Sequence, residues 1–210
     1  MAILATNNSQ PRELIKAGNY LGRCYQMIEV GTVKENILGV EKILHKVRIG
    51  WELPTEQKVF KEENGMQSMV INKEFTLSMH EKSSLRTVLK SWRGKDFTEE
   101  EARSFDITKL IGVPCMINII HKNGKADPSK IYEEISGITG VPKGIIVPDQ
   151  INKTFILSYD SFDEDLFNTL PDFIKDKMKT SLEYAAMKMP NNIQLHEEQK
   201  QLESIDELPF

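Results

Sequence analysis

The chain of 210 residues has little cysteine, no long apolar run and no apparent targeting segment. Its two cysteines, Cys24 and Cys115, are too few and too far apart for a disulfide framework, so we expect both to be small buried side chains. No apolar run approaches the roughly 20 residues that cross a bilayer, and the first residues lack the basic flank and apolar stretch of a secretory signal. These absences predict a cytoplasmic protein with no membrane span.

The sequence also lacks the short motifs that mark common enzymes and metal sites. It contains no GxxxxGK[ST], GxGxxG, HExxH or CxxC pattern. Its histidines have no metal-ligand spacing among themselves or with the cysteines; they are His45, His80, His121 and His196. We therefore expect no enzyme activity and no catalytic residues, and neither a metal ion nor a cofactor.

The net charge of −4 is unevenly distributed along the chain. Residues 1–153 hold 22 basic and 19 acidic residues, a net of +3, whereas residues 154–210 hold 5 and 12, a net of −7. A mildly basic body can attract an anion that the total charge would repel, and an acidic end can compete for the same body. The charge distribution therefore leaves a nucleic-acid partner open.

Hydrophobic periodicity predicts the fold. Residues 20–33, 43–53, 69–79, 114–121 and 130–138 read as five strands. Between the third and fourth, Leu85, Val88, Leu89 and Trp92 follow a helical period, with Ser83 as N-cap and Gly94 as stop; a second short helix is expected from Thr98 to Ser104. This order predicts a mainly β, α+β protein: a five-stranded OB-fold barrel with a capping helix between the third and fourth strands.

Composition shifts divide the chain into four parts. Residues 1–17 are rich in Asn, Ser and Thr and predict a flexible arm, and residues 18–153 form the OB-fold domain. Residues 154–190 predict a strand and helices that pack on the body, including one amphipathic helix over Pro171–Lys188 with Phe173, Ile174, Met178, Leu182 and Ala185 on one side. Residues 191–210 predict a disordered acidic tail.

Cations and aromatic side chains in the body fit single-stranded nucleic acid, which needs a positive surface for phosphates and aromatic faces for bases. The candidate cations are Arg23, Lys46, Arg48, Lys58, Lys61 and Lys73, together with a cationic row formed by Lys82, Arg86, Lys90, Arg93 and Lys95. The candidate stacking residues are Tyr25, Trp51, Phe60 and Tyr132, whereas Trp92 and Phe75 lie on apolar faces and are expected in the core. An ordinary solvated helix face and half-buried surface aromatics remain the alternative interpretations.

Two stretches resemble a known family. The end of the sequence, with Asp206, Glu207, Leu208, Pro209 and Phe210, is similar to the acidic C-terminal tip of bacterial single-stranded-DNA-binding proteins. The stretch from Ile28 to His121, including IEVGTV, VRIGWELP and ITKLIGVPCMINIIHKNG, is similar to phage-encoded OB-fold single-stranded-DNA-binding proteins.

The resemblance implies a non-enzymatic protein that coats single-stranded DNA during phage replication, recombination and repair, in the bacterial host cytoplasm. It implies that DNA crosses the second and third strands, with Lys46, Arg48 and Lys73 facing phosphates and Trp51 or Phe60 stacking on bases. The tip would recruit replication or recombination proteins, and a homo-oligomer is possible. Two alternatives stay open: a recombination annealing or accessory protein that acts as an oligomeric scaffold, and a virion assembly protein whose OB-like barrel binds protein.

Overall fold

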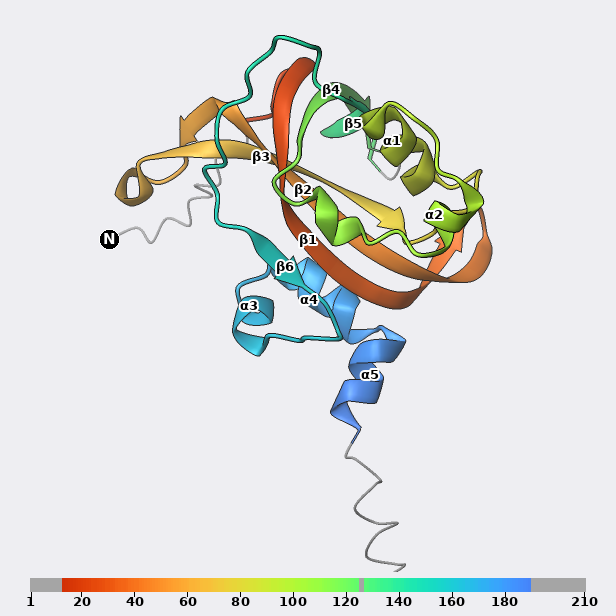
Figure 1. Cartoon of the computed structure of the whole chain (residues 1–210). Coiled ribbons are helices and arrows are strands. Elements are labelled where there is room, and N and C mark those ends of the chain that lie inside the picture. Colours follow the sequence, from red (N-terminus) through yellow and green to blue (C-terminus); the bar gives the residue numbers. More distant parts are fainter. Residues whose placement is uncertain (1–12, 125–126, 190–210) are drawn as a thin grey trace, which may run out of the picture. The chain divides into compact units, whose positions relative to one another are not determined.

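The computed structural model describes residues 13–124 and 127–189, and these form an antiparallel sheet of six strands with several helices (Figure 1). The strand order is β3-β2-β1-β4-β5, and β6 pairs with β1. The strands are β1 (Gly18–Ile37), β2 (Val40–Val59), β3 (Met66–Thr76), β4 (Pro114–Asn123), β5 (Ile131–Thr139) and β6 (Phe155–Leu157). The predicted class, mainly β with helices, is confirmed as an open sheet.

The first two strands are longer than the sequence predicts. Each has 20 residues, whereas the predicted strands end at Val33 and Leu53. The polar residues after Leu53 indicated a loop, but β2 continues through Pro54 to Val59. Residues 55–59 are exposed or partly exposed, and a strand without a buried face shows no hydrophobic alternation for sequence reading to detect.

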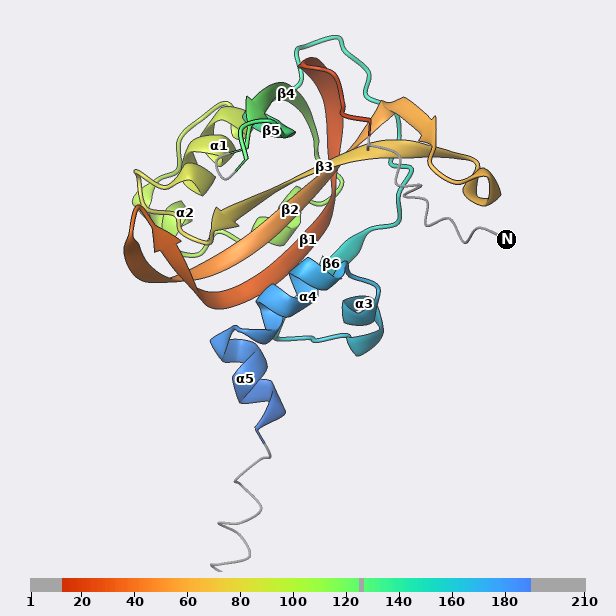
Figure 2. The ribbon, with the colours of Figure 1, turned by 180° about the vertical axis from the view of Figure 1, so that it is seen from behind.

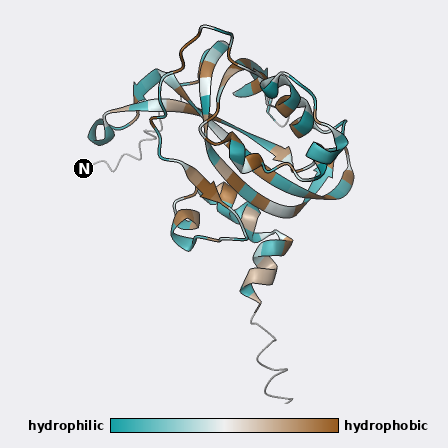
Figure 3. Cartoon of the chain, in the orientation of Figure 1, coloured by the Kyte–Doolittle hydropathy of each residue, from teal (hydrophilic) through white to brown (hydrophobic). Residues whose placement is uncertain are grey.

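Alternation in the middle of β2 is confirmed by burial. Val47, Ile49, Trp51 and Leu53 are at most 2% exposed, and Figure 3 shows the alternating hydropathy along β1 and β2. The opposite side is covered as well, since Glu52 is 0% exposed. Side chains on both faces of β2 are therefore buried around position 52.

Local capping explains where the helices begin. The helical elements are η1 (Glu62–Asn64), α1 (Ser84–Arg93), α2 (Glu99–Arg103), η2 (Ile107–Leu110), α3 (Glu164–Asn168), α4 (Asp172–Lys179) and α5 (Leu182–Lys188). The side chain of Ser83 accepts from the Arg86 amide, and Gly94 ends α1 in the left-handed region with φ of 75°. Thr98 and Glu101 form a capping box at α2. The predicted caps of both helices are confirmed.

The chain divides into two compact units, residues 1–27 with 48–156 and residues 28–47 with 157–210. β1 and β2 contribute residues to both. In the first unit α1 lies against β3 and β5, as Figures 1 and 2 show. The rings of Trp51 and Trp92 are 6.0 Å apart there, and Cys24 and Cys115 are 0% exposed, so the predicted burial of both cysteines is confirmed.

In the second unit, polar groups tie the strand residues to the C-terminal helices. The Glu183 carboxylate accepts from the amide and the hydroxyl of Thr32, each at 2.6 Å. Gly31 has φ of 92°, and a Cβ at this position would lie 2.7 Å from Ser181 Cβ. This close approach requires glycine.

The single helix predicted over Pro171–Lys188 is wrong, because the structure divides it into α4 and α5 at Thr180 and Ser181. The Ser181 side chain, in a residue that is 1% exposed, accepts from the Tyr184 amide and starts α5 as its N-cap. Ile174 and Met178 are buried as predicted, but Phe173 and Leu182 are 64% and 62% exposed. Leu182 therefore begins a separate helix and does not continue the buried side of α4.

The predicted N-terminal arm includes residues that pack on the first unit. Ile15 is 3% exposed, its amide donates to the Glu133 carboxylate, and its carbonyl oxygen lies 2.7 Å from His121 Nε2. Ordered structure thus begins before Gly18, where the sequence analysis placed its start. The rest of the arm, residues 1–12, and the predicted tail with its tip lie outside the described residues.

Candidate nucleic-acid interface

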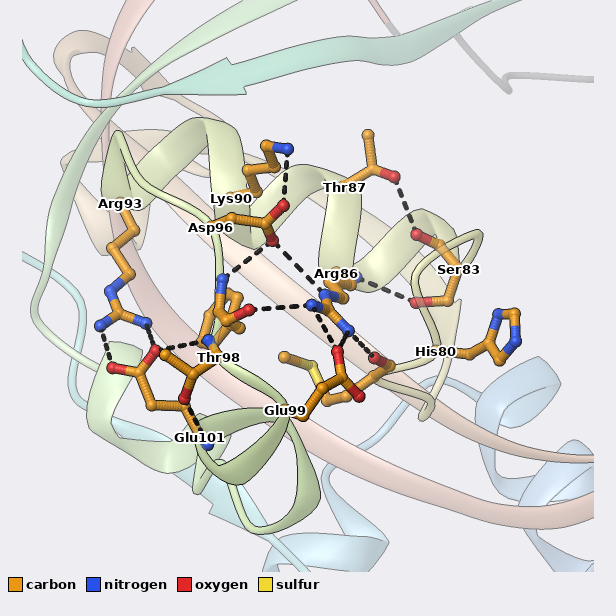
Figure 4. Close-up of polar contacts among 12 residues, drawn as sticks. His80, Ser83, Arg86, Thr87, Lys90, Arg93, Asp96, Thr98, Glu99 and Glu101 are labelled. Atoms are coloured by element: carbon orange, nitrogen blue, oxygen red, sulfur yellow. Dashed lines mark hydrogen bonds and ion pairs between the residues drawn. The ribbon is translucent and has the colours of Figure 1, made fainter.

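The cationic row divides into a buried centre and an exposed rim. Arg86 is 5% exposed, and its guanidinium donates to the carbonyl oxygens of Met79 at 3.1 Å and Phe97 at 2.9 Å (Figure 4). It also pairs with Asp96 and Glu99. The prediction that Arg86 shares a solvent-facing row is therefore wrong: its face of α1 covers the 96–99 segment, whose carbonyls and carboxylates need a buried donor.

The other members of the row lie at the surface, most of them in ion pairs. Lys82 precedes α1 and is exposed, Lys90 Nζ lies 2.6 Å from Asp96, and Lys95 Nζ lies 4.0 Å from Glu101. Arg93 binds both carboxylate oxygens of Glu101.

These pairs perturb the carboxyl groups. The hydrogen bond from Lys90 lowers the pKa of Asp96 to about 2, and the one from Arg93 lowers the pKa of Glu101 to about 2. Both ion pairs stabilise the ionised carboxylates, whose negative charges offset part of the positive charge of the row.

Two cations predicted on the strands, Arg23 and Lys73, donate hydrogen bonds to backbone carbonyl oxygens. Arg23 donates to the carbonyl oxygens of Gly112 at 2.6 Å and Pro148 at 2.8 Å, which anchors the segment after β5. Lys73 Nζ donates to the carbonyl oxygen of Ile135 at 2.6 Å, and burial lowers its pKa. Burial also lowers the pKa of Arg48.

Lys46 belongs to the second unit, and the expectation that it lies on an exposed polar face is wrong. The residue is 9% exposed, and its ammonium lies 3.0 Å from Glu35. Burial alone would raise the pKa of Glu35, but hydrogen bonds from Lys177 and Lys46 hold it below its usual value. Lys46 and Lys177 thus both pair with the Glu35 carboxylate, and Lys46 is a structural cation.

The aromatic candidates separate clearly by exposure. Trp51 is 0% exposed in mid-strand, so its assignment as a stacking residue is wrong. The predicted strand 43–53 leaves Trp51 near its end, whereas β2 continues to Val59. Tyr25 is partly buried, and burial raises its pKa to about 12. Phe60 and Tyr132 are each 52% exposed. Of the four candidates, only these two are exposed residues.

Both exposed rings have lysines beside them. Phe60 follows the end of β2 between Lys58, which pairs with Glu13, and Lys61, whose side chain is 70% exposed. Tyr132 lies in β5 opposite Lys122 of β4, and Lys130 is 67% exposed two residues earlier. We call these two groups the Phe60 site and the Tyr132 site. They combine a stacking surface with charge for phosphates.

A buried carboxylate on β2 was missed by the sequence analysis. Glu52 accepts hydrogen bonds from the Ile151 amide at 2.8 Å, the Asn152 amide at 2.6 Å and the Asn152 side chain at 2.7 Å. It fastens the segment after β5 to the strand. Its partners lie about a hundred residues away, so no local pattern could indicate this role.

Among the described residues, no group of three or more His, Cys, Asp and Glu side chains is placed to hold a metal ion. Within the same ranges, no helix combines the length and the apolar character needed to traverse a bilayer. Comparison of the chain with protein-family models, curated proteins and solved structures finds no match.

Proposed function

We propose that the protein binds single-stranded DNA without catalysing a reaction, and coats it during replication, recombination or repair. The observation that carries the proposal is the pair of exposed aromatic rings, Phe60 and Tyr132, each flanked by exposed lysines in the same compact unit. A ring that is half exposed beside a cation suits a base and its phosphate, because stacking requires an open face and the backbone requires positive charge.

We also propose that the first unit is an OB-fold barrel. The strand order β3-β2-β1-β4-β5, with α1 between β3 and β4, follows the order expected for that fold. β3 also approaches β5, the two ends of the path, and Lys73 of β3 donates to the Ile135 carbonyl of β5. An approach of the two end strands supports closure.

The charge of the unit limits its non-specific affinity. Lys58, Lys61, Lys122 and Lys130 each lie within 4.0 Å of a carboxylate. Exposed pairs of this kind contribute at most about 1 kcal/mol, so phosphates can compete for the same lysines. We therefore expect moderate affinity that falls as salt rises. Recruitment of partners by the tip at Asp206–Phe210 remains part of the proposal.

The test is fluorescence anisotropy with a labelled oligo-dT strand and a matched duplex. A labelled strand is preferred to intrinsic tryptophan fluorescence, because Trp51 and Trp92 are 0% and 6% exposed and would report stacking poorly. We expect tighter binding of the single strand, with a negative slope of log affinity against log salt. Equal affinity for both forms at moderate salt, or no binding, would refute the proposal.

A further inference from the structure

The first unit contains an apolar hollow of about 250 Å³ that the proposed DNA-binding residues do not explain. Its apolar walls come from the end of α1, the segment before α2 and the residues around η2: Leu89, Trp92, Phe97, Phe105, Leu110 and Val113. The volume lies below the roughly 300 Å³ at which small-molecule sites begin. It suits one large apolar side chain.

The walls are fixed by contacts of their own. The Trp92 indole N–H donates to the Pro114 carbonyl oxygen at 2.9 Å. The rings of Phe97 and Phe105 meet edge to face with centroids 4.9 Å apart. A hollow whose walls are already ordered binds with little loss of conformational entropy.

The charge of the lining has one sign. Arg93 and Lys109 complete the wall, and no carboxylate lines it. Arg93 lies over the Phe97 ring at 4.7 Å from its centroid while binding Glu101. Lys109 is exposed in η2. Hydrogen bonds from Thr108 and, to a smaller extent, the charge of Lys109 lower the pKa of Asp106, but Asp106 does not line the hollow. An occupant with negative charge beside an apolar anchor would complement both features.

We propose that the hollow binds an acidic peptide segment of a partner protein, with one large apolar or aromatic side chain inserted between Trp92 and Phe105 and a carboxylate at Lys109. A peptide side chain fits better than a base, because Trp92 and Phe97 are 6% and 5% exposed and offer no open ring face for stacking. Apolar anchors that fill such hollows dominate the affinity of protein interfaces. The site is independent of the Phe60 and Tyr132 sites.

The experiment is an NMR titration of the full-length protein, which follows the indole N–H resonance of Trp92. Only two tryptophans are present, so Trp92→Phe assigns it. The probes are the blocked peptides Asp-Asp-Phe-Asp-Asp, Asp-Asp-Ala-Asp-Asp and Lys-Lys-Phe-Lys-Lys. We expect the first to shift the Trp92 resonance with saturation, and the other two to bind at least about tenfold more weakly, since each lacks one of the two required features.

Two exposed lysines provide a matched pair of variants. Lys109→Glu should weaken the first peptide about tenfold, and less in high salt. Lys143→Glu makes the same charge change in the segment after β5, outside the lining, and should leave the affinity within about twofold. Phe105→Ala should also weaken binding, and the unchanged dispersion of the remaining amide resonances shows that this variant is folded.

Several results would overturn the inference. They are the absence of a Trp92 shift at millimolar peptide, equal binding of the three peptides, and equal effects of Lys109→Glu and Lys143→Glu. A Trp92 shift caused by oligo-dT would assign the hollow to nucleic acid instead. A shift that depends on protein concentration without peptide would assign it to a second copy, and one caused by replacing Leu208 and Phe210 with alanine would assign it to the chain's own C-terminal segment.

Discussion

The α1–α2 segment and the turn between β2 and β3 carry similar sequence signals, cations close to an aromatic residue, yet the structure uses them differently. In the α1–α2 segment the cation Arg86 and the ring of Phe97 are both about 5% exposed, and carboxylates surround the guanidinium. At the turn, Phe60 is 52% exposed and the Lys61 side chain 70%. Burial and pairing, rather than the presence of charge, decide which cations are available to a ligand.

The largest expected effect is on stability in the α1–α2 segment. Arg86→Ala should lower the free energy of unfolding by about 2–4 kcal/mol, because the carbonyls of Met79 and Phe97 lose a buried donor. Lys82→Ala removes an exposed cation of the same row and should change stability by less than about 0.5 kcal/mol. Urea denaturation measures both. Similar stabilities for the two variants would remove the distinction between these cations.

The second expected effect is on DNA affinity at the turn. Phe60→Ala should weaken binding of oligo-dT about tenfold or more, as loss of one stacked base contact predicts, with little change in stability. Tyr132→Ala should have an effect of similar size. The control Phe173→Ala removes another exposed ring, 64% exposed in the second unit, and should leave affinity unchanged. If all three variants bind like the wild type, stacking at the two sites is excluded.

A smaller effect concerns the salt dependence of binding. Lys61→Gln should reduce the slope of log affinity against log salt by about 0.7, the value for one phosphate contact to a single strand. Lys90→Gln should change it less, because the Lys90 ammonium lies 2.6 Å from Asp96. Anisotropy titrations at several salt concentrations give both slopes. A larger change for Lys90→Gln would move the phosphate path to α1.

The smallest effect is the contribution of the surface pairs to acid stability. Asp96 and Glu101 have pKa values of about 2 in the folded protein, below their usual values. A depressed folded pKa stabilises the fold above the unfolded pKa of about 4, and this stabilisation is lost as pH falls from there toward about 2. The thermal midpoint should therefore fall less steeply over this range for Asp96→Asn with Glu101→Gln than for the wild type.

Hydrophobic period and capping residues correctly predicted the features that depend on neighbouring residues in the chain. The hydrophobic period of residues 43–53 and the caps at Ser83 and Thr98 indicated a buried strand, which includes Ile49 and Leu53, and two helix starts, and the structure agrees. Phe60 and Tyr132, two of the four candidate stacking residues, are exposed as a stacking role requires. The two caps depend on partners three residues along the chain, Arg86 for Ser83 and Glu101 for Thr98.

Predictions were wrong where distant groups decide. Arg86 is spaced like a surface cation, but the Phe97 carbonyl, 11 residues away, makes it a buried donor. Trp51 was placed at a strand end because the exposed continuation of β2 has no hydrophobic period. Nothing near Glu52 indicates that Ile151 and Asn152 will donate to it. The sequence therefore included Phe60 and Tyr132 among its candidates, but it could not separate them from the buried Trp51 or distinguish structural cations from available ones.

The hydrogen bonds of Glu52 can form only late in synthesis of the chain, because their donors are added long after the carboxylate. Their donors follow the carboxylate by 99 and 100 residues. At roughly 5–20 residues per second, a ribosome needs about 5–20 s after adding Glu52 before the last of these donors is made. During that interval the Glu52 carboxylate of the nascent chain lacks its native donors, so it must be hydrated by water or bound by a chaperone. The corresponding delay is longer in the second unit, because the Thr32 amide donates to Glu183, which is added 151 residues later.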